Sequence, residues 1–219
     1  MIPMADSIVP GNLPPYPAYL GYVDGKWPTA PAIRKAHPAA RLLTLTVTGA
    51  TDDADGCDQE AGDLGPNTAA MWLKRQLLAG KKRPVLYASR DDVPLTLSIL
   101  APLGTGRADI RILSAHYGQG EHICSPAACG ASFTADGTQY SDTAPGLNGT
   151  TIDLSILNDD FFGVSNVTGI PLDILGSYTN NAGDLFVIGT DADGVLHESK
   201  RTAMGVWSAP YPIAGKVGA

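Results

Sequence analysis

Two acidic residues separated by a single residue, Asp58 and Glu60, are the strongest candidates for chemistry in this 219-residue sequence. Side chains alternate along a β-strand, so both carboxyl groups would leave the same face, roughly 6–7 Å apart by strand rise. Such a pair suits glycoside cleavage: one carboxyl with a raised pKa protonates the glycosidic oxygen, and the other stays ionised and stabilises positive charge. The alternative is an acidic surface loop, because Asp52, Asp53 and Asp55 precede the pair and charge runs are usually solvated.

Strands and helices alternate around this acidic segment. Apolar and β-branched runs predict strands over residues 19–25, 41–48, 83–89 and 110–115. Helices are predicted over residues 31–37, 66–79 and 92–103, with no room for one between the second strand and the acidic segment. After residue 116, strands over 131–140 and 150–157 follow without helices between them. This order predicts an α/β fold with parallel strands, either a barrel or a doubly wound sheet.

Polar residues fall at or just past the C-terminal ends of these predicted strands, where barrels gather their functional groups. They are Asp24, Asp58, Glu60, Ser89 and His116. This placement favours the catalytic interpretation of the acidic pair.

Six short motifs follow one another along about residues 17–160. They are Gly21-Tyr22-Val23-Asp24, Asp58-Gln59-Glu60, residues 83–89, residues 112–117, Gly137-Thr138-Gln139-Tyr140 and Ile152-Asp153-Leu154. In this order they resemble the family-25 glycoside hydrolases, which are lysozyme-type muramidases. They are more similar still to the shorter glycoside-hydrolase-like domains of actinobacteria and their phages. The resemblance implies a short, irregular TIM-like (β/α) barrel.

The resemblance also implies roles for individual residues. Glu60 would be the general acid, and Asp58 would hold the sugar's acetamido group or the developing charge. Asp24 and Asp153 would be supporting carboxylates at the floor of the cleft. The glycan would contact Tyr22, Tyr87, His116, Tyr117 and Tyr140. Each tyrosine could instead pack within the barrel, and His116 could instead be a hydrogen-bonded core residue.

Two departures from that family affect activity more than fold. Gln59 stands where such enzymes usually have an apolar residue, and we expect it on the outward face of the strand, where it would disturb packing under a helix. Only some 17 residues separate Asp24 from the second strand, so the barrel is short and could lack walls that position a polysaccharide. The expected function is a retaining hydrolase of peptidoglycan or another glycan. The alternative is a non-catalytic glycan-binding or structural component of a phage virion.

The ends of the chain differ from its middle. Five prolines in residues 1–18 predict an extended arm rather than a helix or inner strand. Residues 19–162 would form the barrel, and residues 163–219 a small all-β appendage. In the appendage, strands are predicted over 172–178, 184–190, 194–200 and 205–213. This segment resembles one blade of a tectonin-like or fucolectin-like β-propeller. A lone blade leaves strand edges open, so we expect a homo-oligomer or a subunit of a larger assembly.

Charge and hydropathy exclude some partners. The formal net charge is −7 and the longest basic cluster is Lys81-Lys82-Arg83, which argues against nucleic acid. No apolar run is long enough to span a membrane. The N-terminal residues have neither the basic nor the apolar part of a secretion signal. The expected location is a virion, or else the cytoplasm or the exterior by another route.

The sequence has three cysteines, and their number does not decide whether a disulfide forms. Cys124 and Cys129 could close a small disulfide loop outside a reducing cytosol, leaving Cys57 unpaired. His116 and His122 lie nearby in sequence and make a Cys/His metal site conceivable. Their spacing matches no established zinc pattern, so neither a metal nor a cofactor is expected.

Overall fold

The structure is a computed structural model that describes residues 1–162, 173–180, 185–190, 195–201 and 211–216. The chain divides into two compact units, Met1–Phe161 and Phe162–Ala219. Within the described residues, every helix is too short or too polar to cross a lipid bilayer.

The first unit is a closed barrel of eight strands, joined in sequence order. The strands are β1 (Ile2–Asp6), β2 (Ala18–Tyr22), β3 (Arg41–Thr46), β4 (Gly56–Gln59), β5 (Val85–Ser89), β6 (Arg111–Ala115), β7 (Gly137–Pro145) and β8 (Thr151–Leu157). Neighbours from β1 to β7 pair in parallel. Strand β8 runs antiparallel to both β7 and β1 and closes the barrel. The predicted barrel is confirmed, but the mixed strand directions and partial helical cover do not define a TIM-like (β/α) barrel.

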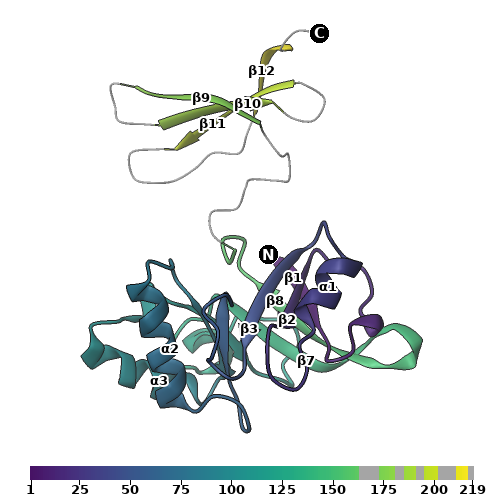
Figure 1. Ribbon diagram of the computed structural model, residues 1–219, viewed down its shortest axis with the longest axis vertical. Helices are drawn as coiled ribbons and strands as arrows, with labels where there is room; N and C mark the ends of the chain where they lie inside the picture. Colours follow the sequence, from purple (N-terminus) through teal and green to yellow (C-terminus); the bar gives the residue numbers. More distant parts are fainter. Residues whose placement is uncertain (163–172, 181–184, 191–194, 202–210, 217–219) are drawn as a thin grey trace. The chain divides into compact units, whose positions relative to one another are not determined.

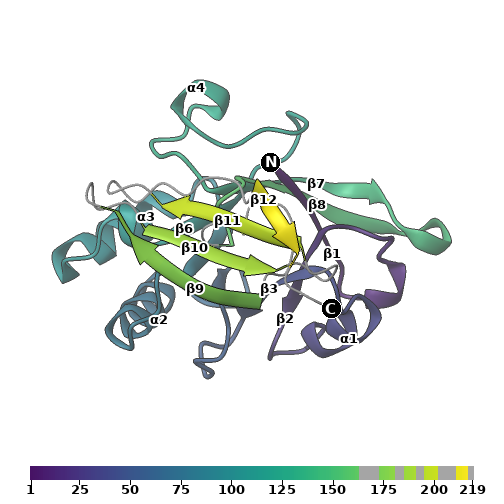
Figure 2. The ribbon, with the colours of Figure 1, turned by 90° about the horizontal axis from the view of Figure 1, so that it is seen from above.

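Helices cover the barrel unevenly. They are α1 (Ala30–Ala36) after β2, α2 (Pro66–Leu78) after β4, α3 (Val93–Leu100) after β5 and the short α4 (Pro126–Cys129) after β6. Figures 1 and 2 show α2 and α3 side by side on one flank of the barrel, with α1 on the opposite flank. The connection from β3 to β4 has no helix, as predicted. Short 3₁₀ turns occupy Pro10–Asn12, Ala101–Leu103, Arg107–Asp109 and Leu147–Gly149.

The first strand corrects the prediction of an extended arm. Ile2–Asp6 lies between β8 and β2, although it contains Pro3. Proline lacks a backbone N–H, so it is tolerated at the start of a strand. Here pairing with β2 begins only at Met4, one residue later. Met4, Ala5 and Asp6 are all buried, because this strand completes the barrel.

Alternation along the strands separates two environments. The outward side chains of β4, β5 and β6 pack under α2 and α3; they include Cys57, Leu86, Ala88 and Ile112, against Trp72, Leu73, Val93 and Leu100. Residues between them on the same strands, such as Asp58 and Tyr87, therefore point into the barrel. At Gly56, an added Cβ would lie 2.6 Å from the Val85 carbonyl oxygen, so only glycine lets β4 and β5 approach this closely.

The second unit is a four-stranded antiparallel sheet in the order β12-β11-β10-β9. Its strands are β9 (Asp173–Thr179), β10 (Leu185–Thr190), β11 (Val195–Arg201) and β12 (Tyr211–Lys216). Three of the predicted strands agree to within one residue. The fourth prediction began at residue 205, and residues 205–210 lie outside the described residues.

Candidate functional site

Carboxyl, amide and phenol groups from six strands, and from the loops after β4 and β6, meet inside the barrel, at the C-terminal ends of the parallel strands. We call this set the inner cluster. Its members are Asp6, Tyr22, Asp58, Glu60, Tyr87, Tyr117, Gln139 and Asp153. The structure thus brings together most of the predicted site residues, and adds Asp6 and Gln139 to them.

Gln139 on β7 links three parts of the inner cluster. The hydroxyl of Tyr87 donates to its Oε1 at 2.6 Å, and the hydroxyl of Tyr117 donates to the same oxygen. Its Nε2 donates to Oδ1 of Asp6 at 3.2 Å. Because Gln139 is almost fully buried, these bonds fix the side chains of β1, β5 and the loop after β6 relative to one another.

Asp58 lies on β4 and Glu60 directly after the strand ends. Carboxyl oxygens of Asp58, Glu60 and Asp63 all lie within 4.8 Å of one another. The two predicted site residues differ in access: Asp58 is only 1% exposed, whereas Glu60 is exposed. The Oδ1 atom of Asp58 is buried and has no hydrogen-bond partner among the described residues.

The acids of the inner cluster hold protons more tightly than free carboxyls. Burial, with the charges of Glu60, Asp63 and Asp6, raises the pKa of Asp58 to about 9. Burial and Asp63 also raise the pKa of Glu60, although a hydrogen bond with Tyr87 opposes this shift. The sequence suggested one raised and one ionised carboxyl; instead, the pKa values of both rise and Asp58 is neutral at pH 7.

Asp6 and Asp153 form a second pair of acids, opposite each other on β1 and β8. Burial and the nearby Asp153 raise the pKa of Asp6 well above its usual value. Burial, Asp142 and Glu60 raise the pKa of Asp153 to about 6, while a hydrogen bond from Asp6 lowers it. Within this pair Asp6 is therefore the hydrogen-bond donor and Asp153 the acceptor. None of the ion pairs among the described residues includes an acid of the inner cluster.

Three predicted site residues lie apart from the inner cluster. Asp24 accepts hydrogen bonds from Thr46 Oγ1 and Thr48 Oγ1, both at 2.5 Å, and from the Val47 N–H at 2.8 Å. Burial acts to raise the pKa of Asp24, but these hydrogen bonds outweigh it and lower the pKa. Asp24 thus fastens the end of β2 to the end of β3.

Tyr140 and His116 are the other two. Burial raises the pKa of Tyr140, and the charged or ionisable groups that act on it are Glu121 and Tyr16, outside the inner cluster. His116 contacts Arg90 and His122 instead of the acids.

Sequence reasoning missed Asp6 and Gln139. Asp6 ends a short apolar run, as Asp24 does, and the surrounding prolines hid that signal. Gln139 belongs to a motif already identified, but alternation puts it on the opposite face from Tyr140. Only the pairing of β7 with β6 and β8 decides which of the two faces inward.

Gln59 lies on the outer face of β4, as predicted, but the predicted disturbance of packing is wrong. It is buried beneath α3, and the Thr96 hydroxyl of that helix donates to its Oε1. A polar residue is tolerated here because its buried oxygen has a partner.

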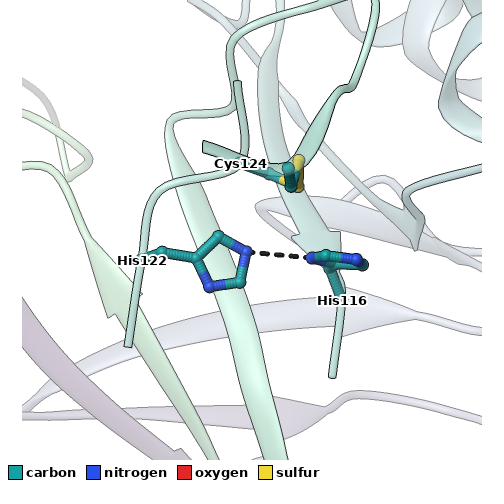
Figure 3. A group of neighbouring side chains, drawn as sticks. His116, His122 and Cys124 are labelled. Atoms are coloured by element: carbon teal, nitrogen blue, oxygen red, sulfur yellow. Dashed lines mark hydrogen bonds between the residues drawn. A yellow bond between two sulfur atoms is a disulfide. The ribbon is translucent and has the colours of Figure 1, made fainter. Parts of the chain in front are cut away.

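A second group of side chains surrounds the end of β6. It contains His116, His122, Cys124 and Cys129, whose possible ligand atoms all lie within 4.8 Å of one another; we call it the His/Cys cluster. Figure 3 shows the two imidazoles joined by a hydrogen bond. His116 Nδ1 and His122 Nε2 are 3.0 Å apart, and the rings meet edge to face. Cys124 and Cys129 form a disulfide, and Cys57 is buried and free, so this possible pairing is confirmed.

Comparisons with known proteins give a limited result. No family model and no curated protein matches the chain, and the predicted resemblances to family-25 hydrolases and to a propeller blade gain no support from them. Among solved structures, the chain is similar to the crystal structure of the CTP1L endolysin, whose activity is regulated by a secondary translation product. The TM-score is 0.48 at 14% identity, over 74% of this chain and 68% of that one. A likeness of this extent defines neither activity nor substrate.

Proposed function

We propose that this chain is a glycoside-hydrolase-like protein that acts on bacterial cell-wall glycan, with a shortened TIM-like barrel and retaining acid catalysis. The observation that carries the proposal is the proximity of an exposed acid, Glu60, to a buried neutral one, Asp58, at the C-terminal end of β4. Their carboxyl oxygens are within 4.8 Å, so a sugar held by Asp58 would lie within reach of Glu60.

Glu60 is the general acid in this proposal. It is the accessible member of the pair, and its raised pKa keeps more of it protonated near neutral pH than a free glutamate would be. Asp58, which is neutral and has an oxygen without a partner among the described residues, can hold the acetamido group of the sugar by a hydrogen bond. The acetamido oxygen would then attack the anomeric carbon as Glu60 protonates the leaving oxygen, and water would open that intermediate while Glu60 takes back a proton.

The surrounding acids favour a cationic transition state. Asp153 is ionised at neutral pH, and no ion pair among the described residues neutralises it. Positive charge at the anomeric carbon would also favour ionisation of Asp58 and Asp6. The inner cluster would therefore stabilise the developing cation more than the neutral ground-state sugar. Tyr22, Tyr87 and Tyr117 would line this position.

Release of reducing ends from purified peptidoglycan tests the proposal. We expect Glu60→Gln to lower the rate at least about a hundredfold, because it removes the proton donor and keeps the shape. Asp53→Asn, in the exposed acidic segment before β4, is the matched control and should leave the rate unchanged. If Glu60→Gln cleaves as fast as the wild type, the assignment of the acid is wrong.

A second candidate is a non-catalytic glycan-binding or structural component of a virion. It is favoured by the C-terminal sheet, in which β9 and β12 each have a strand neighbour on one side only within the described residues. Such open edges are usually covered by another chain or segment, so this candidate predicts an oligomer or an assembly subunit. Wild-type protein that binds peptidoglycan but releases no reducing ends would favour it. A monomeric mass by light scattering at micromolar concentration would contradict the assembly.

A further inference from the structure

The His/Cys cluster has the composition of a transition-metal site, and its two bonded sulfurs would have to separate on reduction to reach the spacing of metal ligands. Zinc binds thiolate sulfur at about 2.3 Å and imidazole nitrogen at about 2.0 Å, so ligand atoms around a tetrahedral ion lie about 3.3–3.8 Å apart. The four possible ligand atoms here are within 4.8 Å of one another, and the two imidazole nitrogens are 3.0 Å apart. We infer that reduction of the Cys124–Cys129 disulfide creates a site for Zn²⁺ or a similar divalent transition metal, held by two thiolates and two imidazoles.

The backbone already holds these residues in place. The N–H of His116 donates to the Gln139 carbonyl at 2.9 Å, which fixes the end of β6 against β7. The N–H of Cys124 donates to the Thr138 hydroxyl at 2.8 Å, and the Cys124 carbonyl accepts from Ala135 at 2.8 Å. Cys124 and the barrel end are thus fixed before any ion binds, which reduces the entropy cost of assembling the site.

Hydrogen bonds assign the protons on the two imidazoles. His122 Nδ1 faces the Gly120 carbonyl at 2.8 Å, which can only accept, so Nδ1 carries the proton and Nε2 has a free lone pair. A backbone carbonyl that orients the far nitrogen of a histidine is a common support for a metal ligand. His122 therefore presents Nε2 to the cluster in the form that a metal requires.

His116 needs one rearrangement. Arg90 Nη1 donates to its Nε2 at 3.1 Å, so in the disulfide form the proton of a neutral His116 lies on Nδ1, directed at His122. Metal binding through Nδ1 moves that proton to Nε2, and Arg90 gives up this contact. Arg90 keeps its bonds to the Cys129 carbonyl and to Asp91. A site with two thiolates and a divalent ion is neutral overall, so Arg90 is not repelled from it.

The chemistry balances with a dithiol as reductant. The dithiol supplies two electrons and two protons, becomes a disulfide itself, and leaves Cys124 and Cys129 as thiols. The metal then binds both sulfurs as thiolates, and two protons pass to solvent. The disulfide would hold the loop between β6 and β7 under oxidising conditions, and the metal would hold it under reducing conditions. This inference does not depend on the proposed glycan chemistry.

Cobalt binding to the full-length chain tests the inference. We expect protein reduced with a phosphine, and freed of it without oxygen, to bind one Co²⁺ per chain. It should show the visible absorption of tetrahedral cobalt and the near-ultraviolet band of thiolate ligation, and Zn²⁺ should abolish both. The disulfide form should lack the thiolate band and bind at least about a hundredfold more weakly, because both thiolate ligands are absent.

Two variants separate this site from adventitious binding. His122→Ala leaves the disulfide and the barrel intact, and should weaken cobalt binding by the reduced protein at least about a hundredfold. The matched control is His37→Ala, at the end of α1, which should bind as the wild type does. The inference is wrong if reduced wild-type protein shows no thiolate band, or if His122→Ala binds as tightly as His37→Ala.

Discussion

Buried carboxyl groups have different partners at the two ends of the barrel. At the N-terminal ends of the parallel strands, Asp136 lies between two guanidinium groups, 2.6 Å from Arg83 and 2.6 Å from Arg107. It also accepts the N–H of Ile112 at 2.8 Å. At the C-terminal ends, the acids of the inner cluster face one another, and none takes part in an ion pair found among the described residues.

Asp136 therefore stabilises the fold, whereas the acids of the inner cluster destabilise it when they ionise. A buried carboxylate is stable when charged donors surround it, as at Asp136. Carboxyls gathered without cations have raised pKa values and reduce stability where they would otherwise ionise. Natural proteins keep such arrangements mainly at functional sites, so the contrast supports a functional role for the inner cluster.

The largest effect is expected at the paired end. Asp136→Asn should destabilise the protein by about 3 kcal/mol, because two guanidinium groups lose their shared partner. Unfolding in denaturant at pH 7 measures this change. Asp52→Asn, which breaks the exposed pair with Arg75, is the control and should have a much smaller effect. If Asp136→Asn is as stable as the wild type, the ion pairs of Asp136 do not stabilise the fold, and the difference proposed between Asp136 and the inner cluster is wrong.

The next largest effect is a gain of stability, expected when an acid of the inner cluster is replaced. The pKa of Asp58 is about 9 in the folded protein, far above its value in the unfolded chain, so the folded state binds its proton more tightly. Wild-type stability should therefore fall as the pH rises from about 4 to about 9. Asp58→Asn removes this loss, and we expect it to be more stable than the wild type by at least about 2 kcal/mol at pH 8. At pH 4 the two should differ little.

Asp24 supplies the control for that experiment. Its pKa is lowered, so it contributes stability above its unfolded pKa, and that stability is lost as the pH falls through the folded value. Asp24→Asn should therefore be less stable than the wild type at pH 8. If Asp58→Asn and Asp24→Asn change stability in the same direction, the distinction between the two acids fails.

The smallest effect is expected on the outer face of β4, where Gln59 accepts a hydrogen bond from Thr96. Thr96→Val leaves the buried oxygen of Gln59 without a donor and should cost about 1–2 kcal/mol. Adding Gln59→Leu to that variant should recover most of the loss, because neither polar partner then remains. Thermal unfolding of the single and double variants measures the coupling. A double variant that is less stable than Thr96→Val alone would contradict this explanation.

The sequence predicts the parts of this fold that local patterns encode. Strands β2 to β6 and helices α1 to α3 follow from apolar runs, proline positions and periodicity. The placement of Asp58 and Gln59 on opposite faces of β4 follows from alternation alone. The pattern could not show β1, because Pro3 and the prolines after Asp6 resemble an irregular arm, and this strand depends on partners far away in sequence.

Long-range pairing also decides the composition of the site. Asp6 meets Asp153 because β1 and β8 close the barrel, and no local pattern connects residues so distant. Gln139 and Tyr140 are neighbours in one predicted strand, and the sequence does not show which of them points into the barrel. The register of β7 places Gln139 inside. Asp24 follows its strand, as an acid of the site is expected to do. Its carboxylate instead accepts hydrogen bonds from the hydroxyls of Thr46 and Thr48. The pKa values depend on all of these contacts and could not be read from the acidic pair alone.

One paired measurement on Glu60→Gln tests the central claim, that the inner cluster is maintained for glycan cleavage at the expense of stability. Cell-wall solubilisation and the free energy of unfolding should be measured on the same preparations at the same pH. The account predicts that solubilisation falls at least about a hundredfold while stability stays equal or rises, because a like charge leaves the cluster. Undiminished solubilisation by Glu60→Gln, or a loss of activity that merely follows a loss of stability, would contradict it.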